Sequence, residues 1–213
     1  MILYDYWRSS SGWRVRTALH YKGIPFERRV VNLIKDGGGE QHGDAFRALN
    51  PSGQVPVLVT DDGRPIAQSM AIIAFLEEQF PTPPLLPTDP WRRARARQLA
   101  EMVNSGTQPL QNLPVLDHVQ AKGIDRNEWA HHFIARGLAA LEAAAQETAG
   151  TFLVGDAVSI ADAYLIPQLY NARRFKVDVS RLPTLLRVET ACAALPAFAA
   201  AHPDAQSDAK PAP

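Results

Sequence analysis

Five prolines fall within ten residues of this 213-residue chain, at positions 81, 83, 84, 87 and 90. Proline lacks a backbone N–H and fixes its φ angle, so such a segment cannot continue a helix or a central strand. Residues 81–90 are therefore predicted to be a linker between two domains. Asp89-Pro90 has the pattern of a helix N-cap followed by proline at the first helical position, which predicts that the second domain begins with a helix.

Residues 1–80 alternate between strand and helix patterns. The spacing of their apolar side chains and the turn residues between them predict four strands and three helices. The strands are expected over 2–6, 26–31, 57–60 and 65–68, and the helices over 11–21, over 44–49 and from Ser69, which we expect to be an N-cap. This order predicts an α/β domain with a mixed sheet.

The chain after the prolines is almost entirely helical in pattern, most clearly over 92–106, 127–148 and 161–173. Ser159 and Asp162 have the spacing of a capping box, which we interpret as the structural start of a buried helix. An all-α domain is predicted over residues 91–203. The polar, proline-bearing residues 204–213 are predicted to be a disordered tail.

The composition excludes several classes of protein. The chain has 46% hydrophobic and 21% charged residues, with 22 Lys and Arg against 22 Asp and Glu, so neither nucleic acid nor an acidic membrane is an expected partner. It lacks an apolar run of roughly 18 residues and a signal-peptide pattern, which favours a cytoplasmic protein. Cys192 is the single cysteine and is expected to be a buried core thiol. The arrangement of the six histidines in the sequence does not indicate a metal site.

Three consecutive serines stand where the first strand passes into a helix, within the run from Arg8 to Arg16. A helix N-terminus offers unsatisfied N–H groups and a positive dipole end, so this place can hold an anion. A thiolate is one candidate anion. Because the one cysteine is far away in the sequence, the sulfur is expected to come from a bound ligand.

These features occur together with a series of short motifs in one order. The motifs are Arg8-Ser9-Ser10-x-x-Trp13-Arg14-Val15-Arg16, Asn32–Lys35, Ala48–Pro51, Gln54–Pro56, Gln68-Ser69, Pro81–Pro83, Gln108–Asn112 and Arg174–Asp178. In this order the chain resembles the cytosolic glutathione transferases, and most of all the zeta class with its maleylacetoacetate and maleylpyruvate isomerases. The resemblance implies a thioredoxin-like domain over 1–80 with a mixed four-stranded sheet, the linker 81–90, and a helical substrate domain.

The resemblance implies that glutathione is the cofactor and that Ser9 or Ser10 is the catalytic serine. We favour Ser9 as the donor to the sulfur, with Ser10 in support, and Tyr6 as the rival hydroxyl. A serine that donates to a thiolate stabilises its charged form, as does the helix dipole. The family pattern is usually Ser-Ser-Cys-Ser, and Ser11 stands at its cysteine position with Gly12 after it.

The resemblance also implies the other contacts to the two ligands. In the family the proline at Pro56 is cis and the backbone before it, at Val55, pairs with the cysteinyl part of glutathione. The glutathione-binding residues implied are Ser9, Ser10, Ser11, Gln41, Val55, Pro56, Gln68, Ser69, Gln108, Gln111 and Asn112. The substrate-binding residues implied are Arg8, Arg174, Gln108 and Asn112, with Arg173 as the alternative to Arg174; Arg8 is also expected at the catalytic centre.

The implied reaction is the conversion of maleylacetoacetate to fumarylacetoacetate in aromatic amino-acid catabolism. A thiolate adds to the cis double bond, the bond rotates, and the thiol is eliminated. The alternatives are a maleylpyruvate isomerase of gentisate breakdown, a general glutathione transferase or α-halo acid dehalogenase, and a non-catalytic module of the same fold. The family resemblance further implies a homodimer.

Overall fold

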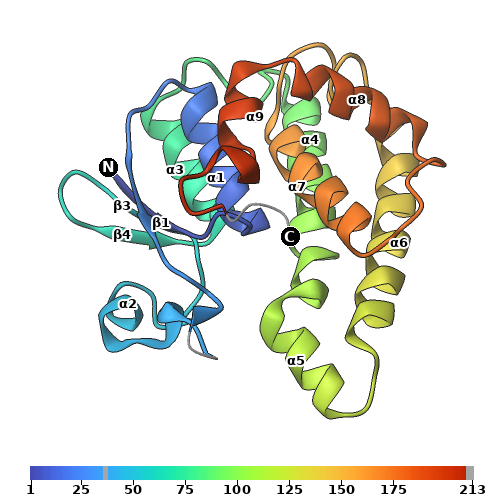
Figure 1. The fold of residues 1–213 in the computed structure, drawn as a ribbon. Coiled ribbons are helices and arrows are strands. Elements are labelled where there is room, and N and C mark those ends of the chain that lie inside the picture. The colour runs from blue at the N-terminus through green and yellow to red at the C-terminus, as the bar shows by residue number, and fades with distance from the viewer. Residues whose placement is uncertain (36–37, 210–213) are drawn as a thin grey trace. The chain divides into compact units, whose positions relative to one another are not determined.

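The computed structural model describes residues 1–35 and 38–209. They form two compact units. The first joins Met1–Pro84 to the segment that begins at Leu195, and the second runs from Leu85 to Ala194. Figure 1 shows the elements of both units in chain order.

The first unit is built on a four-stranded mixed sheet with the strand order β2-β1-β3-β4. Strand β1 pairs parallel to β2 and antiparallel to β3, and β3 pairs antiparallel to β4. The strands are β1 Ile2–Asp5, β2 Glu27–Val30, β3 Val57–Val59 and β4 Pro65–Ala67. The predicted mixed sheet is therefore confirmed.

Helices cover both faces of this sheet. They are α1 Ser10–Tyr21, α2 Asp44–Leu49 and α3 Ser69–Gln79, with a short 3-10 helix η2 at Glu40–His42. Figure 1 shows α1 and α3 on one side of the sheet and α2 on the other. Successive side chains of β1 point to opposite faces. Tyr4 consequently meets the ring of Phe46 in α2 at 6.3 Å between centroids, while Leu3 is fully buried.

Helix α3 begins one residue earlier than its serine predicted. Gln68 is the N-cap, with a φ of 72°, and Ser69 is the first helical residue. The prediction that Ser69 is the N-cap is wrong, because the left-handed turn at Gln68 already directs the chain into the helix. The Ser69 hydroxyl instead accepts a hydrogen bond from Nη1 of Arg14 at 3.3 Å.

The end of the chain belongs to the first unit. Helix α9, Pro196–Ala201, packs against α1 and is followed by the 3-10 helix η4, Pro203–Ala205. This differs from the predicted helical domain to residue 203 and the disordered tail 204–213. In this segment the carboxylate of Asp208 accepts hydrogen bonds from the Trp7 N–H and from Nη1 of Arg28. Residues 210–213 of the predicted tail lie outside the described residues.

The second unit consists of helices, among which α4 packs against α7 and α6. They are α4 Pro90–Asn104, α5 Leu113–Ala121, α6 Arg126–Ala145, α7 Ile160–Arg174 and α8 Pro183–Ala193, with the 3-10 helix η3 at Gln108–Gln111. Leu99, Ile134 and Leu165 are in its core. The Asp89 carboxylate accepts from the Arg92 N–H at 2.8 Å, which confirms the predicted cap.

Cys192 of α8 is fully buried, as predicted. Burial raises the pKa of its thiol, so this sulfur stays protonated and unreactive. None of the helices within residues 1–35 and 38–209 is long and apolar enough to cross a membrane. Over the same described residues, no group of three or more His, Cys, Asp or Glu could hold a metal ion.

Candidate active site

The strand register of the first unit brings three predicted site segments to one edge of the sheet. Tyr4 near the end of β1 pairs with Val57, the first residue of β3. Val57 in turn pairs with Ala67, the last residue of β4. The chain that leaves β1, the chain that enters β3 and the chain that leaves β4 therefore meet at the same edge. These three segments carry the serines, Val55-Pro56 and Gln68-Ser69.

Ser9 is the N-cap of α1. Its Oγ accepts from the N–H of Gly12 at 3.1 Å, and its own N–H donates to the carbonyl of Tyr6 at 2.9 Å. The cap uses Oγ as an acceptor, so the hydroxyl proton is left for an acceptor outside the helix. The first turn of α1 holds no acidic residue of its own, so none of its side chains neutralises the positive end of the helix.

The other hydroxyls of the turn differ from Ser9 in place and burial. Ser10 is the first residue of α1 and is 9% exposed, whereas Ser9 and Ser11 are half-buried. Tyr6 is 6% exposed and its ring lies 5.9 Å from that of Trp7. The exposure and the capping geometry both favour Ser9 as the donor to a bound sulfur.

Gly12 stands where the family pattern has a serine, and the structure gives a reason for glycine. A Cβ at this position would lie 1.6 Å from Oδ1 of Asp5. The Asp5 carboxylate is fully buried and forms ion pairs with Arg16 and Arg28. Because those two cations hold the carboxylate against the helix, a side chain at Gly12 has no room.

The Val55-Pro56 peptide bond is cis, as the family resemblance implied. The loop before it is fixed by Asn50, whose Nδ2 donates to the carbonyl of Gln54 at 2.7 Å. Val55 is half-buried and Pro56 is buried. The backbone at Val55 thus lies at the sheet edge beside the serine turn.

Gln68 and Ser69 form a second helix N-terminus at this edge. The first turn of α3 holds no acidic residue, and Gln68 makes no side-chain cap to the helix. Like α1, this helix presents a positive end that its own side chains leave uncompensated. Two such ends at one edge of a sheet suit a ligand with more than one negative group.

Gln41, which the resemblance implies as a glutathione contact, lies in the loop before the cis-proline segment. It lies in η2 and is 8% exposed, and its Nε2 donates to the carbonyls of Gly38 at 2.9 Å and Leu33 at 3.4 Å. This amide nitrogen is therefore used to fold its own loop. The loop is close to the cis-proline segment, since a Cβ on Gly53 would lie 3.1 Å from the Gln41 carbonyl. Contact of Gln41 with glutathione stays a prediction.

Arg8 extends beside Trp7, with its guanidinium carbon 5.2 Å from the ring centroid. Among the described residues, no carboxylate forms an ion pair with it. It stands directly before Ser9 in the turn. A cation in this position is available to a carboxylate of a ligand.

The polar residues predicted in the second unit fall into two groups. Gln108 and Asn112 bond to each other through Nε2 and Oδ1 at the ends of η3. Gln111 turns inward, where its Nε2 donates to Oε1 of Gln168 in α7 at 2.7 Å. That buried bond gives Gln111 a structural role, and its contact with glutathione stays a prediction.

Arg173 and Arg174, the last two residues of α7, have different neighbours. Arg173 forms a two-pronged ion pair with Glu189 of α8, at 2.6 Å for each nitrogen. Hydrogen bonding to Glu189 raises the pKa of Arg173, although its partial burial acts in the opposite direction. The guanidinium of Arg174 lies 5.2 Å from the ring of Phe175. Because both terminal nitrogens of its guanidinium are bound to Glu189, Arg173 would have to break this ion pair to bind a substrate carboxylate.

A buried charged cluster that was not predicted from the sequence lies under the serine turn. Arg16 of α1 is fully buried, and it donates to the carbonyls of Trp7 at 2.9 Å and Tyr6 at 3.4 Å and pairs with Asp5. Burial lowers the pKa of Arg16, and the charge of Asp5 opposes that effect. An aspartate inside an apolar strand was the available signal, because a buried carboxylate needs a partner.

Comparison with known families agrees with this architecture. The family model for the glutathione S-transferase N-terminal domain matches residues 8–79, and the model for the C-terminal domain matches residues 131–196. The two matches cover the sheet edge with its serines and the helices α6, α7 and α8.

Named relatives match over nearly the whole chain. Maleylacetoacetate isomerase from Rattus norvegicus is 50% identical over 207 residues, which covers 97% of this chain and 94% of the relative. A crystal structure of maleylacetoacetate isomerase from Anaeromyxobacter dehalogenans 2CP-1, with dicarboxyethyl glutathione and citrate in the active site, is 54% identical with a TM-score of 0.88, and covers 98% of this chain and 97% of the other. A maleyl pyruvate isomerase, described as a bacterial zeta-class glutathione S-transferase, is 42% identical with a TM-score of 0.93, and covers 99% of this chain and 100% of the other.

Proposed function

We propose that this chain, which belongs to the glutathione S-transferase family and to its zeta class, is a glutathione-dependent isomerase that converts maleylacetoacetate to fumarylacetoacetate. The observation that carries the proposal is the sheet edge where two helix N-termini without acidic residues meet the cis-proline segment. The rat relative at 50% identity bears the name of this activity. The solved relative from Anaeromyxobacter holds a glutathione with a dicarboxylic substituent.

The donor set of the first unit fits glutathione. The hydroxyl of Ser9 has a proton to give to a sulfur, and the N-terminus of α3 at Gln68-Ser69 can receive a carboxylate. The backbone at Val55 stands between these two sites along the sheet edge. A peptide with a thiol in its centre and carboxylates at its ends matches that sequence of sites.

Bound glutathione supplies a thiol whose deprotonated form adds to an activated double bond and leaves again after rotation. The residues of this chain set the conditions for that chemistry. The Ser9 hydroxyl donates toward the sulfur position, and the positive end of α1 lies behind it, so both favour the thiolate. A free thiol has a pKa near 8.5, and each unit of lowering corresponds to about 1.4 kcal/mol.

The arginines serve the substrate in this proposal. Maleylacetoacetate is a dianionic diketo acid, and a guanidinium binds a carboxylate through two parallel hydrogen bonds. Arg8 stands next to Ser9 and has no described carboxylate partner, which supports it as one such contact. Arg174 is proposed as a second contact, with Arg173, which forms an ion pair with Glu189, as the alternative. Gln108 and Asn112 are proposed as further polar contacts.

The decisive test is a turnover assay with maleylacetoacetate and with maleylpyruvate, each with and without glutathione. We expect turnover of maleylacetoacetate that requires glutathione. The likeness to a maleyl pyruvate isomerase at a TM-score of 0.93 keeps maleylpyruvate as the second candidate substrate. A higher kcat/KM for maleylpyruvate would replace the first substrate by the second. Absence of turnover with both would overturn the isomerase proposal.

The donor to the sulfur is tested by the ionisation of bound glutathione. Its thiolate absorbance is followed against pH in Ser9→Ala, Ser10→Ala and Tyr6→Phe. We expect the largest rise of the thiol pKa in Ser9→Ala, with kcat/KM reduced by about 100-fold, because an aimed hydroxyl donor is lost. Ser10→Ala and Tyr6→Phe should change the pKa less. Unchanged ionisation in both serine variants would contradict the proposed role of the turn.

The arginine contacts are tested with two kinds of electrophile. Arg8→Ala and Arg174→Ala should lower kcat/KM for the dianionic substrate by about 10-fold or more, since each removes a charged hydrogen-bond donor. A neutral chloro-dinitro arene should be affected much less. Arg173→Ala is the matched control at the end of α7. Equal losses on the two kinds of electrophile would refute a carboxylate-binding role.

We also propose a homodimer that acts in the cytoplasm, as the resemblance to the cytosolic transferases implies. Light scattering on the purified protein should give twice the mass of the 23.4 kDa chain. A monomer mass at assay concentration would refute the dimer. Fractionation of cells that express the tagged chain tests the compartment.

A further inference from the structure

The last described residues of the chain form a strap that returns to the serine turn. The strap, residues 195–209, contains α9 and η4 and packs on α1. Its His202 ring meets Trp13 edge-on at 5.0 Å between centroids. Its Ala201 carbonyl accepts from Nε of Arg16 at 3.0 Å. Both contacts are made with α1, the helix that Ser9 caps.

The strap also contacts the turn itself. Oδ2 of Asp208 accepts from the backbone N–H of Trp7 at 3.2 Å, across 201 positions of sequence. The Trp7 carbonyl accepts from Nη2 of Arg16 at 2.9 Å. Trp7 is thus fixed on one side by Asp208 and on the other by Arg16, which the strap itself holds through Ala201.

A chain of alternating charges connects the strap to the sheet. Oδ1 of Asp208 accepts from Nη1 of Arg28 at 2.5 Å. Nε of Arg28 lies 3.4 Å from the carboxylate of Asp5, which also pairs with Arg16. The side chain of Asp208 is 16% exposed, and those of Asp5 and Arg16 are 0% exposed. Shielding from water strengthens each of these contacts.

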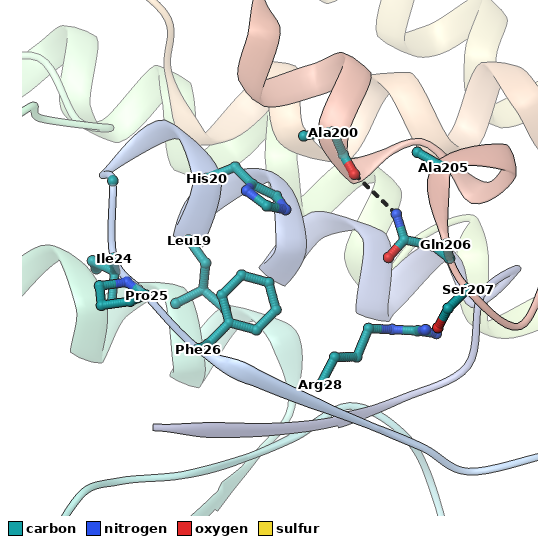
Figure 2. Close-up of a pocket in the computed structure, with 11 residues that line it drawn as sticks. Leu19, His20, Ile24, Pro25, Phe26, Arg28, Ala200, Ala205, Gln206 and Ser207 are labelled. Atoms are coloured by element: carbon teal, nitrogen blue, oxygen red, sulfur yellow. Dashed lines mark hydrogen bonds between the residues drawn. The ribbon is translucent and has the colours of Figure 1, made fainter.

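The end of the strap borders a cavity. The cavity has a volume of about 620 Å³ and is lined among others by His20, Phe26, Arg28, Gln206 and Ser207. Figure 2 shows the cavity with Gln206, whose Nε2 donates to the carbonyl of Ala200 at 2.9 Å. Beside this cavity, the carboxylate of Asp208 connects the strap directly to the backbone of the turn.

We propose that Asp208 is a positioning residue for catalysis, which fixes the Trp7 backbone and through it the direction of the Ser9 hydroxyl. Ser9 lies two residues after Trp7, and its N–H bonds the carbonyl of Tyr6, the residue before Trp7. Movement of Trp7 therefore moves both ends of the turn. A displaced hydroxyl donates less well to the sulfur, and misplacement of a catalytic group by an ångström can cost about 100-fold in rate. The inference rests on the proposed function, because Ser9 is the donor to the sulfur there.

The experiment compares Asp208→Ala and Asp208→Asn with the wild-type chain, with Asp204→Ala as control. Asp204 lies on the same strap, and its carboxylate lies 3.6 Å from Nδ1 of His202. Asparagine keeps an oxygen that accepts from the Trp7 N–H, but it lacks the charge that pairs with Arg28. The readouts are amide hydrogen exchange at Trp7 and Ser9 without glutathione, the thiol pKa of bound glutathione, and kcat and KM per folded enzyme.

We expect Asp208→Ala to speed exchange at Trp7 and to lower kcat, each by about 10-fold, with a raised thiol pKa and a KM changed less than about twofold. Asp208→Asn should give exchange protection and kcat between those of Asp208→Ala and the wild type, because it loses the charge that pairs with Arg28, and Asp204→Ala should match the wild type. If Asp208→Ala is too unfolded to assay, Asp208→Asn decides: partial loss in the same readouts supports the proposal, and wild-type values overturn it.

The outcomes separate the inference from the proposed function. Wild-type exchange at Trp7 and a wild-type thiol pKa in Asp208→Ala would overturn the inference and leave the isomerase intact. The inference would also be overturned if kcat and KM change by the same factor while the thiol pKa is unchanged. Lack of isomerase turnover in the wild-type chain would overturn the proposed function, whereas the exchange experiment would still test the link from Asp208 to the turn.

Discussion

Helices α1 and α7 both begin with a serine N-cap, but only the first turn of α7 contains an acidic residue. Ser9 of α1 is half-buried, and its first turn contains no acid. Ser159 of α7 is 1% exposed, and both its N–H and its hydroxyl donate to the carboxylate of Asp162, at 2.7 and 2.9 Å. The Asp162 carboxylate also accepts from the N–H of Leu153 at 2.8 Å. The first end is open to a ligand, and the second is filled by the chain itself.

The difference shows what makes a helix N-terminus available to an anion. Every such end carries unsatisfied N–H groups and a positive dipole, so the end alone is not specific. At α4 and α6 the chain supplies the carboxylates of Asp89 and Asp125. At α1 and α3 the N-cap is not an acid and the first turn contains no acidic residue. The absence of an acid in the first turn, together with a neighbouring sheet edge, supports the proposal that these two ends bind glutathione.

The largest expected effect comes from removing the buried acid at the N-terminus of α7. Asp162→Ala removes the acceptor of three buried donors, on Leu153 and Ser159, and each buried donor left without a partner costs roughly 1–3 kcal/mol. Burial raises the Asp162 pKa to about 6, so its loss also relieves a desolvation cost. We expect a net loss of about 3 kcal/mol in the free energy of unfolding, measured in urea at neutral pH.

The matched control is Asp125→Ala, which removes an exposed cap. Its carboxylate accepts from the N–H groups of Asn127 and Glu128, both of which water can reach after the change. A loss of about 1 kcal/mol is expected there. Equal losses at the two caps would show that burial does not distinguish the closed end from an ordinary one.

The sequence predicted most of the regular structure because its signals are local. The proline cluster set the boundary before α4, and side-chain alternation gave the strands. The capping box at Ser159 and Asp162 was recognisable from spacing alone, and its predicted structural role is confirmed. The cis bond at Val55-Pro56 came from the family resemblance, since no local pattern demands it.

Other parts depend on contacts that no local pattern contains. Asp208 meets Trp7 across 201 positions, in a segment whose composition predicted disorder. The pairing of Arg173 with Glu189 links two helices, so the sequence did not separate Arg173 from Arg174. The left-handed conformation of Gln68 shifted the start of α3 past the expected cap at Ser69. Each difference arises from tertiary contacts or backbone geometry that periodicity does not report.

A smaller effect is expected from adding an acid to the first turn of α1. Ser11→Glu places a carboxylate in the first turn of α1, where the helix dipole favours it and where the thiolate is proposed to bind. Glutathione affinity should fall by about 10- to 100-fold, because two like charges in a partly buried site repel by a few kcal/mol at most. The affinity is measured by titration calorimetry, and thermal unfolding is measured in parallel.

Ser11→Gln is the control, since it has the size of glutamate without its charge. It should retain most of the glutathione affinity. The stability of Ser11→Glu should not decrease, because an acid in the first turn stabilises a helix by roughly 0.3–1 kcal/mol. Equal affinities in the two variants would mean that steric bulk, rather than a filled positive end, blocks the site.

The smallest expected effect concerns the packing behind the open end. A glycine-to-alanine change inside a helix normally stabilises it by roughly 0.8–1 kcal/mol. At Gly12 the added Cβ would stand 1.6 Å from Oδ1 of Asp5, a carboxylate held by Arg16 and Arg28, and overpacking typically costs about 1–3 kcal/mol. The steric cost exceeds the helix gain, so Gly12→Ala should lose about 1 kcal/mol in urea unfolding. An increase in stability would show instead that the Asp5 carboxylate moves aside without cost, and that glycine at this family position is not imposed by the buried ion pairs.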